Sequence, residues 1–386
     1  AALLGKAATG PYKPVAMHII IVDDSQPYDG ARAMAGPIGA MEKAVAHLAT
    51  ALVERDHSVQ VFTHGADPQP VGAVAWRALG GERPIHADAL IACRRPSSLN
   101  FVSSVPRRIL WATAPGFTLQ GEAHQARILA FGATTVLQGR YHEETWDGGL
   151  KMPMRVITPG VAAPFLERKA MESADPPVAI VTGDPRHGLD WLVQMWVSGV
   201  NPIAPKAELH IYSAALQAFA DGATPPDDYR KINAAVIAAK HRNIKVKAPL
   251  PDAEMVGVLR AARVHMHSGS PLDMLAGTLS ESQAIGLPAV VRPHGAAVER
   301  VRDGQSGVVT DDEGAFATAV LKLLNNDSEF RRMSAQARMT AGRRSWDTAA
   351  AEWEALFADI APVDAADTEE VEAAAPDEEA PAQANG

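Results

Sequence analysis

The sequence lacks several features that would assign it to common protein classes. It has one cysteine, Cys93, so it can form neither an internal disulfide nor a cysteine-based zinc site. This fits a reducing compartment, and we expect a cytoplasmic protein. No apolar run approaches the length of a membrane-spanning helix. Residues 1–16 contain too short an apolar patch for a signal peptide, and we predict a flexible extension there.

The sequence also lacks an excess of positive charge. Its net charge is −9, but eight acids and no base fall between Asp364 and Glu379. Without that segment the chain has a net charge of −1, which gives no electrostatic footprint for nucleic acid. Residues 362–386 are rich in Ala, Glu, Asp and Pro, and they predict a disordered acidic tail.

The 386 residues, of which 47% are hydrophobic, suit two globular domains of common size. Short apolar runs that end in polar residues, such as MHIIIVDD at 17–24, alternate with helical stretches such as 38–52. This alternation predicts doubly wound α/β sheets. We expect one such domain over 17–160, a charged and proline-containing linker over 161–177, and a second domain over 178–340. Two α/β halves in series predict a ligand cleft between them.

The first candidate site is GPIGAMEK, residues 36–43, which joins the first predicted strand to the first long helix. Glycines there let a backbone approach a ligand, and the helix N-terminus offers free N–H groups to an anion. The spacing is G-x-x-G, so the dinucleotide fingerprint is not met. Taken alone, the stretch is more simply a strand-to-helix turn with Pro37 near the helix start.

The second candidate is TGDPRHGLDWL, residues 182–192, which leaves the first strand of the second half. Arg186 and His187 lie in a glycine-flanked loop that opens a helix. A cation beside free helix N–H groups suits a diphosphate. The alternative, more common without context, is a surface arginine in a salt bridge beside a solvated histidine.

The third candidate is PLDMLAGTLSESQAIGLP, residues 271–288. Thr278 with Glu281, or Ser280 with Gln283, matches the spacing of a capping box at a helix start. Alternatively, the amides of 277–279 could hold a phosphate while Glu281 accepts both hydroxyls of a ribose. Taken alone, the stretch favours the capping interpretation.

Other residues with catalytic or metal-binding chemistry show no convincing pattern. His265 and His267 alternate on one face of a predicted strand, but the sequence provides no third metal ligand, so we interpret both as satisfied, partly buried side chains. Cys93 falls inside an apolar strand and is expected to be inert. The sequence contains neither a G-x-S-x-G nor a Walker motif.

In their order along the chain, these motifs resemble the family 4 retaining glycosyltransferases of the GT-B fold. The glycine loop with the helix and strand after it, VITPGVAAPF at 156–165, and the loop at 182–193 are similar to the family's opening, interdomain and donor-phosphate elements. Asp273 and Glu281 fall on its Glu-x7-Glu motif, and AVERVRDGQSGVVT at 297–310 resembles its closing motif. The similarity runs over about 17–345 and is most specific over 265–310.

The resemblance implies two Rossmann-like domains facing a cleft, with a C-terminal helix, 341–361, crossing back to the N-terminal domain. It also implies transfer of a sugar, with retention, from a nucleotide-diphosphate donor to a glycan, lipid-linked or other hydroxyl acceptor, without a bound metal or cofactor. Glu281 would hold the ribose, Asp273 the sugar hydroxyls, and Arg186 and His187 the phosphates. The implied donor-binding residues are Gly39, Arg186, His187, Asp273, Gly277, Thr278, Leu279 and Glu281, with Arg186 and Asp273 also catalytic.

The sequence departs from the family at several of these positions. Asp273 is one methylene shorter than the usual Glu, and His187 replaces a lysine. Gly183-Asp184 stands in place of an arginine, and Ala112-Thr113 in place of a histidine near the acceptor side. An alternative is therefore a catalytically degenerate GT-B protein that binds a sugar nucleotide or glycan or serves as a scaffold; a sugar-nucleotide epimerase is a remoter one. A lipid-linked acceptor would bring the protein to a membrane surface, although no basic amphipathic stretch argues for it.

Overall fold

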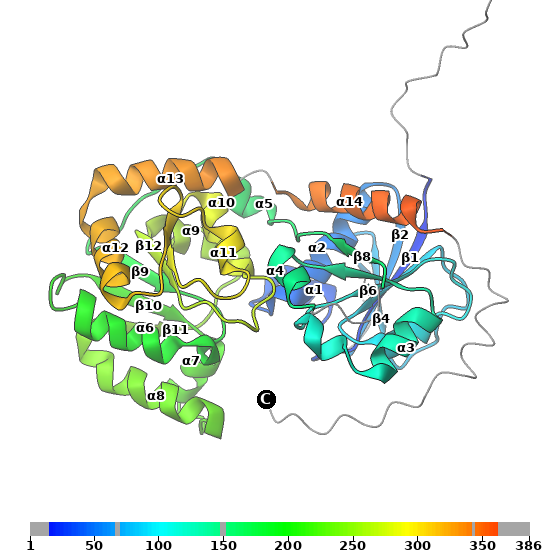
Figure 1. Ribbon diagram of the computed structural model, residues 1–386, viewed down its shortest axis with the longest axis horizontal. Helices are drawn as coiled ribbons and strands as arrows, with labels where there is room; N and C mark the ends of the chain where they lie inside the picture. The colour runs from blue at the N-terminus through cyan, green and yellow to red at the C-terminus, as the bar shows by residue number, and fades with distance from the viewer. Residues whose placement is uncertain (1–14, 66–69, 147–151, 342–343, 362–386) are drawn as a thin grey trace, which may run out of the picture.

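The computed structural model describes residues 15–65, 70–146, 152–341 and 344–361. The predicted acidic tail and most of the predicted N-terminal extension lie outside these residues. Within them the chain forms two α/β domains side by side, each built on its own sheet (Figure 1). No described helix has the length and apolar character needed to cross a membrane.

The N-terminal sheet has the strand order β3-β4-β2-β1-β5-β6-β7-β8 and is parallel except for the β3–β4 pair. Its central strand, β1, reads HIIIVD and is almost entirely buried, as expected for a parallel strand covered on both faces. The strands are β1 (His18–Asp23), β2 (Ser58–Thr63), β3 (Pro70–Val71), β4 (Val74–Ala78), β5 (Ala89–Cys93), β6 (Arg108–Trp111), β7 (Thr134–Leu137) and β8 (Met154–Val156). Its helices are α1 (Gly30–Ala35), α2 (Ala40–Glu54), α3 (Glu122–Ala130) and α4 (Arg140–Glu144).

The C-terminal sheet has the order β11-β10-β9-β12-β13-β14, and all of its paired strands are parallel. Its strands are β9 (Val178–Val181), β10 (Glu208–Tyr212), β11 (Ile244–Lys247), β12 (Val264–His267), β13 (Ala289–Val291) and β14 (Gly307–Val309). Its helices are α5 (Ala163–Leu166), α6 (Leu189–Met195), α7 (Ala214–Ala220), α8 (Asp227–Ala239), α9 (Asp252–Ala261), α10 (Gly277–Ile285), α11 (Ala297–Arg300), α12 (Glu313–Asn325) and α13 (Asp327–Ala341). The α/β prediction is thus confirmed; the exact limits of the domains and the linker stay predictions.

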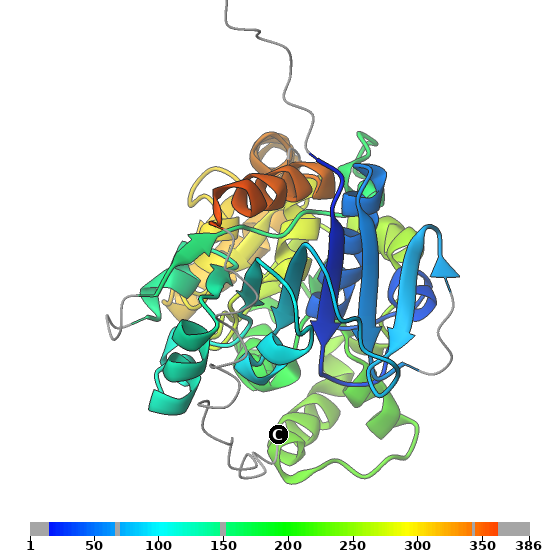
Figure 2. The same ribbon diagram turned by 90° about the vertical axis from the view of Figure 1, so that its right-hand side faces the viewer.

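The last helix, α14 (Trp346–Asp359), returns from the C-terminal domain to pack on the N-terminal one (Figures 1 and 2). Trp353 meets Trp111 of β6 edge to face, with 5.2 Å between ring centroids. The buried Glu354 carboxylate contacts His57 at 3.0 Å and Arg55 at 2.7 Å. The predicted crossing-back helix is therefore confirmed: Ala350, Trp353 and Phe357 are buried in the core of the N-terminal domain.

Candidate donor site between the two domains

A cavity of about 460 Å³ lies between the two domains. The N-terminal domain contributes the loop before α2 and its first turn, residues 36–40 and Lys43. The C-terminal domain contributes segments after β9, β10 and β12, together with the starts of α9 and α10. Ligands of parallel α/β sheets bind beyond such carboxyl ends. Six predicted site residues line this cavity: Gly39, His187, Asp273, Gly277, Thr278 and Glu281.

Gly39 precedes α2 as its N-cap residue, and no side chain caps the helix there. A Cβ at Gly39 would clash with the Glu42 carboxylate, which an ion pair of 2.8 Å with Arg94 holds in place. Glycine therefore suits this position in two ways: it leaves room for the Glu42 carboxylate, and it lets a ligand approach the backbone. The uncapped N–H groups of the first turn of α2 adjoin the cavity and are suited to an anion.

Arg186 does not line the cavity. Its guanidinium pairs with Asp184 at 2.7 Å and with Asp228 at 3.2 Å, and it lies over the ring of Tyr229. Hydrogen bonding to Asp184 raises the pKa of Arg186 above its usual value. The observed contacts are therefore those of the surface salt bridge that the sequence offered as the alternative for this loop. The position of Arg186 at the donor phosphates stays a prediction, and it requires the side chain to leave Asp184.

Asp273 shapes the turn that leads into α10. Its Oδ1 accepts hydrogen bonds from the amides of Leu275 at 3.0 Å and Ala276 at 2.8 Å. Ala276 has a φ of 46°, a left-handed conformation that this acceptor helps to hold. Oδ2 lies 3.9 Å from Nε2 of His267, a second residue that lines the cavity. Asp273 thus has one oxygen fixed by its own backbone and one directed toward the histidine.

The capping-box prediction for α10 is wrong. A capping box with Thr278 as the N-cap would start the helix at Leu279, but the helix starts two residues earlier, at Gly277. The observed N-cap residue is Ala276, whose side chain cannot accept a hydrogen bond. Thr278 instead accepts a hydrogen bond of 2.7 Å from Thr182 of the opposite loop. Glu281, in the second turn, faces across the cleft rather than back to the cap.

Leu279 fits its predicted role least well. Its amide donates to the Ala276 carbonyl at 3.1 Å, so this N–H is already used within the turn. Its side chain is buried in an apolar cluster with Ala289 and Val291. This residue does not line the cavity, and its side chain packs in the core of the C-terminal domain. Its predicted role at a donor phosphate stays a prediction.

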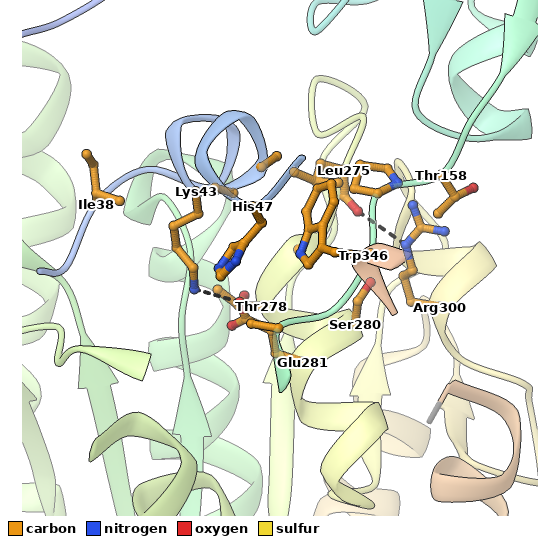
Figure 3. A pocket seen from close by; sticks show the side chains of 16 residues that line it. Ile38, Lys43, His47, Thr158, Leu275, Thr278, Ser280, Glu281, Arg300 and Trp346 are labelled. Atoms are coloured by element: carbon orange, nitrogen blue, oxygen red, sulfur yellow. Dashed lines mark hydrogen bonds and ion pairs between the residues drawn. The ribbon is translucent and has the colours of Figure 1, made fainter. Parts of the chain in front are cut away.

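Sequence reasoning missed Lys43, to which it gave no role. Its Nζ lies 2.6 Å from Glu281 Oε1 (Figure 3). It also lies 2.6 Å from Asp252 Oδ1, so an N-terminal-domain cation reaches two C-terminal-domain carboxylates. Burial raises the pKa of Glu281 although Lys43 opposes the shift. Burial alone would lower the pKa of Lys43, but Glu281 and Asp252 raise it above its usual value. The sequence offered one indication of this role: Lys43 follows Gly39 by four positions, so both residues lie on the same face of α2.

Behind Glu281 lies a smaller cavity of about 80 Å³ (Figure 3). The ring of His47 stacks on Trp346 of the crossing-back helix, with 5.7 Å between centroids and 18° between planes. Burial lowers the pKa of His47 to about 4, so this ring is neutral at pH 7. Both residues line this smaller cavity, and neither lines the larger one.

The two strand histidines are buried and hydrogen-bonded, as interpreted from the sequence. His265 lies between the hydroxyls of Ser282 at 2.8 Å and Thr182 at 3.0 Å, and burial lowers its pKa to about 3. Nδ1 of His267 accepts from the Gly269 amide at 3.0 Å, which leaves Nε2 to carry the proton of the neutral ring. In the part of the chain that the structure describes, no group of three or more His, Cys, Asp or Glu side chains is arranged to hold a metal ion.

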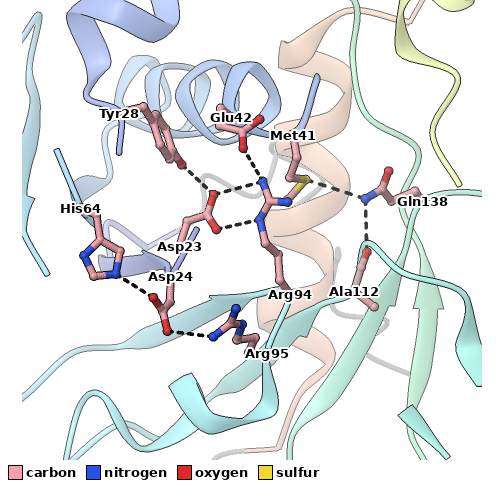
Figure 4. Close-up of polar contacts among 10 residues, drawn as sticks. All are labelled: Asp23, Asp24, Tyr28, Met41, Glu42, His64, Arg94, Arg95, Ala112 and Gln138. Atoms are coloured by element: carbon pink, nitrogen blue, oxygen red, sulfur yellow. Dashed lines mark hydrogen bonds and ion pairs between the residues drawn. The ribbon is translucent and has the colours of Figure 1, made fainter. Parts of the chain in front are cut away.

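The N-terminal sheet has its own polar network at the carboxyl ends of β1 and β5 (Figure 4). The Asp23 carboxylate accepts from Arg94 at 2.8 Å and from the Tyr28 hydroxyl at 2.9 Å, and Arg94 also reaches Glu42 at 2.8 Å. We call these four residues the Asp23 network. All its contacts lie within one domain. The neighbouring Cys93 is buried, and burial raises the pKa of its thiol, in keeping with an inert cysteine.

Comparison with known proteins supports the assignment of fold and family. Residues 176–326 match the family model described as Glycosyl transferases group 1. Over 118 residues the chain is 30% identical to D-inositol 3-phosphate glycosyltransferase of Corynebacterium urealyticum, a match covering 30% of this chain and 28% of that relative. The matched part therefore spans less than a third of the relative's length.

Two solved structures show how far the fold is shared. Sucrose-phosphate synthase from Thermosynechococcus elongatus superposes with a TM-score of 0.68 at 15% identity, over 88% of this chain and 98% of that one. Anabaena Alr3699/HepE, in complex with UDP and glucose, superposes with a TM-score of 0.65 at 13% identity, over 89% and 99%. The resemblance to the family 4 GT-B glycosyltransferases is thereby confirmed, by sequence over residues 176–326 and by fold over most of the chain.

Proposed function

We propose that the protein is a retaining glycosyltransferase that moves a sugar from a nucleotide-diphosphate donor to a hydroxyl acceptor. One observation carries the proposal: Asp273 and Glu281, eight positions apart, both line the interdomain cavity opposite the N-terminus of α2. A carboxylate accepts hydrogen bonds from two adjacent hydroxyls, whereas helix N-termini favour phosphate. The cavity therefore combines groups for the sugar and for the diphosphate.

In this proposal the ribose binds Glu281, and the diphosphate lies between the start of α2 and the loop of residues 183–188. As the bond between the anomeric carbon and the diphosphate breaks, negative charge builds on the leaving phosphate. Backbone N–H groups near Gly39 and Gly277, the Thr278 hydroxyl and His187 would stabilise that charge. Asp273 would contact sugar hydroxyls through Oδ2, since Oδ1 is bound to the backbone. The proposal requires no resident cofactor.

The solved Alr3699/HepE complex contains UDP and glucose, which makes uridine nucleotides the first to test. Thermal shifts with UDP, GDP and ADP sugars would identify the base, and donor turnover with any binder would follow. Turnover with retained anomeric configuration is the expected result. No shift with any nucleotide would contradict the proposal. A shift without turnover over a wide acceptor panel would assign a binding or scaffold role instead.

A further inference from the structure

Lys43 forms an ion pair with the Glu281 carboxylate, the group that binds the ribose in the proposed function. Its ammonium lies 2.6 Å from Glu281 Oε1, and the two residues come from different domains. The side chains of Lys43 and Glu281 are each 15% exposed and that of Asp252 is 21% exposed, so solvent screens these contacts only weakly. A ribose that used both Glu281 oxygens would have to take Oε1 from the lysine.

Asp252 provides the lysine with a second partner. Its Oδ1 is also 2.6 Å from the ammonium, and it is the first residue of α9, where the helix dipole favours a carboxylate. The three side chains carry a formal charge of −1 together, because one cation faces two acids. Lys43 can therefore leave Glu281 without becoming an unpaired buried charge.

On the basis of the proposed function, we propose that Lys43 is a further residue of the nucleotide site. It neutralises Glu281 before the nucleotide binds, and the ribose displaces it onto Asp252. The affinity for the nucleotide then depends on how much the free energy of the ribose–Glu281 contact exceeds that of the Lys43–Glu281 contact. Because Lys43 belongs to α2 and Glu281 to α10, the exchange also removes one ion pair that joins the two domains.

The test is calorimetric titration of UDP, or whichever nucleotide the panel identifies, into wild type and three variants at pH 8. Lys43→Met removes the competitor, so its Kd should fall by about fivefold or more, the low end of typical coupling between sites. Asp252→Asn removes the alternative partner, so Kd should rise by a similar factor. Lys322→Met is the control, because it also removes one lysine paired with an acid, Glu329, and neither residue lines the interdomain cavity. It should leave Kd unchanged.

The opposite signs distinguish displacement from a direct contact. If Lys43→Met binds the nucleotide more weakly than wild type, Lys43 contacts the nucleotide itself and the proposal is overturned. An unchanged Kd in Lys43→Met overturns it too. Should that variant fail to fold, Lys43→Gln repeats the loss of charge with a polar side chain. If wild type binds no nucleotide, the proposed function itself has failed, an outcome distinct from binding with the wrong sign in the variants.

Discussion

The polar residues at the carboxyl ends of the two sheets are organised differently. In the N-terminal domain the Asp23 network has all its contacts within one domain, and its charges are paired at 2.8 Å. In the interdomain cavity, Glu281 has its cation in the other domain. Asp273 has one oxygen bound to its own backbone, and its other oxygen lies 3.9 Å from His267. A network closed within a domain stabilises the fold, whereas a partner across a cleft can be exchanged for a ligand. Four predictions test this distinction.

Arg94→Ala should have the largest effect. The substitution leaves the buried Asp23 and Glu42 carboxylates without their cation, which should reduce the free energy of unfolding by about 3 kcal/mol. Chemical denaturation measures it. The neighbouring Arg95 is the control: it is 56% exposed and 3.6 Å from Asp24, so Arg95→Ala should change stability by less than about 0.5 kcal/mol. Equal losses in the two variants would show that the Asp23 network is not a special stabilising element.

Glu281→Ala should weaken nucleotide binding about tenfold or more, equivalent to about 1.4 kcal/mol. The physical reason is the loss of the acceptor for the ribose hydroxyls. Calorimetric titration gives the affinity, and a melting curve shows whether the variant remains folded. A variant that loses stability but binds with wild-type affinity would make Glu281 a structural partner of Lys43 only.

Asp273→Ala should reduce the free energy of unfolding by about 1 kcal/mol, because the amides of Leu275 and Ala276 lose their acceptor. Affinity for the free nucleotide diphosphate should stay within about twofold of wild type, whereas affinity for the nucleotide sugar should fall. Titrations with the two ligands separate these effects. An equal loss for both would mean that the turn before α10, and not the sugar contact, is what the substitution removes.

His265 should add a small pH dependence to stability. Burial lowers its pKa to about 3 in the folded protein, below the ordinary value of 6.5, so the unfolded state binds the proton first and acid destabilises the fold. Between pH 7 and pH 6 this histidine should remove about 0.7 kcal/mol of stability. Denaturation at both pH values should show a smaller loss of stability in His265→Gln. The loss should not vanish, because burial also lowers the pKa of His47 and of His142 to about 4. Identical losses in the two proteins would contradict a neutral, buried His265.

The features that the sequence could predict are those that depend on residues close together in the chain. The strands were predictable because each contains a short apolar run, IIIV at 19–22 in β1 and VAIV in β9, and such a run is a local property of the sequence. Gly39, His187 and the turn before α10 were predictable because each belongs to a short motif in a recognisable order. The Lys43–Glu281 pair was not, since it joins residues 238 positions apart and depends on how the domains pack.

The errors have equally local causes. The helix containing Glu281 starts at Gly277, and a start two residues early moves Thr278 out of the N-cap position that the capping box requires. The role of Arg186 at the phosphates stays a prediction. Its ion pair with Asp228 was not predictable, because Asp228 lies on α8, whose position no local motif indicates.

Hydrogen–deuterium exchange with and without the best-binding nucleotide tests the central claim most directly. The interdomain site predicts slower exchange in both domains at once, over 36–43 and 277–285, with no change over 89–95, the segment that carries Arg94 of the Asp23 network. Slowing confined to one domain, or found only outside these segments, would contradict a nucleotide site between the two domains.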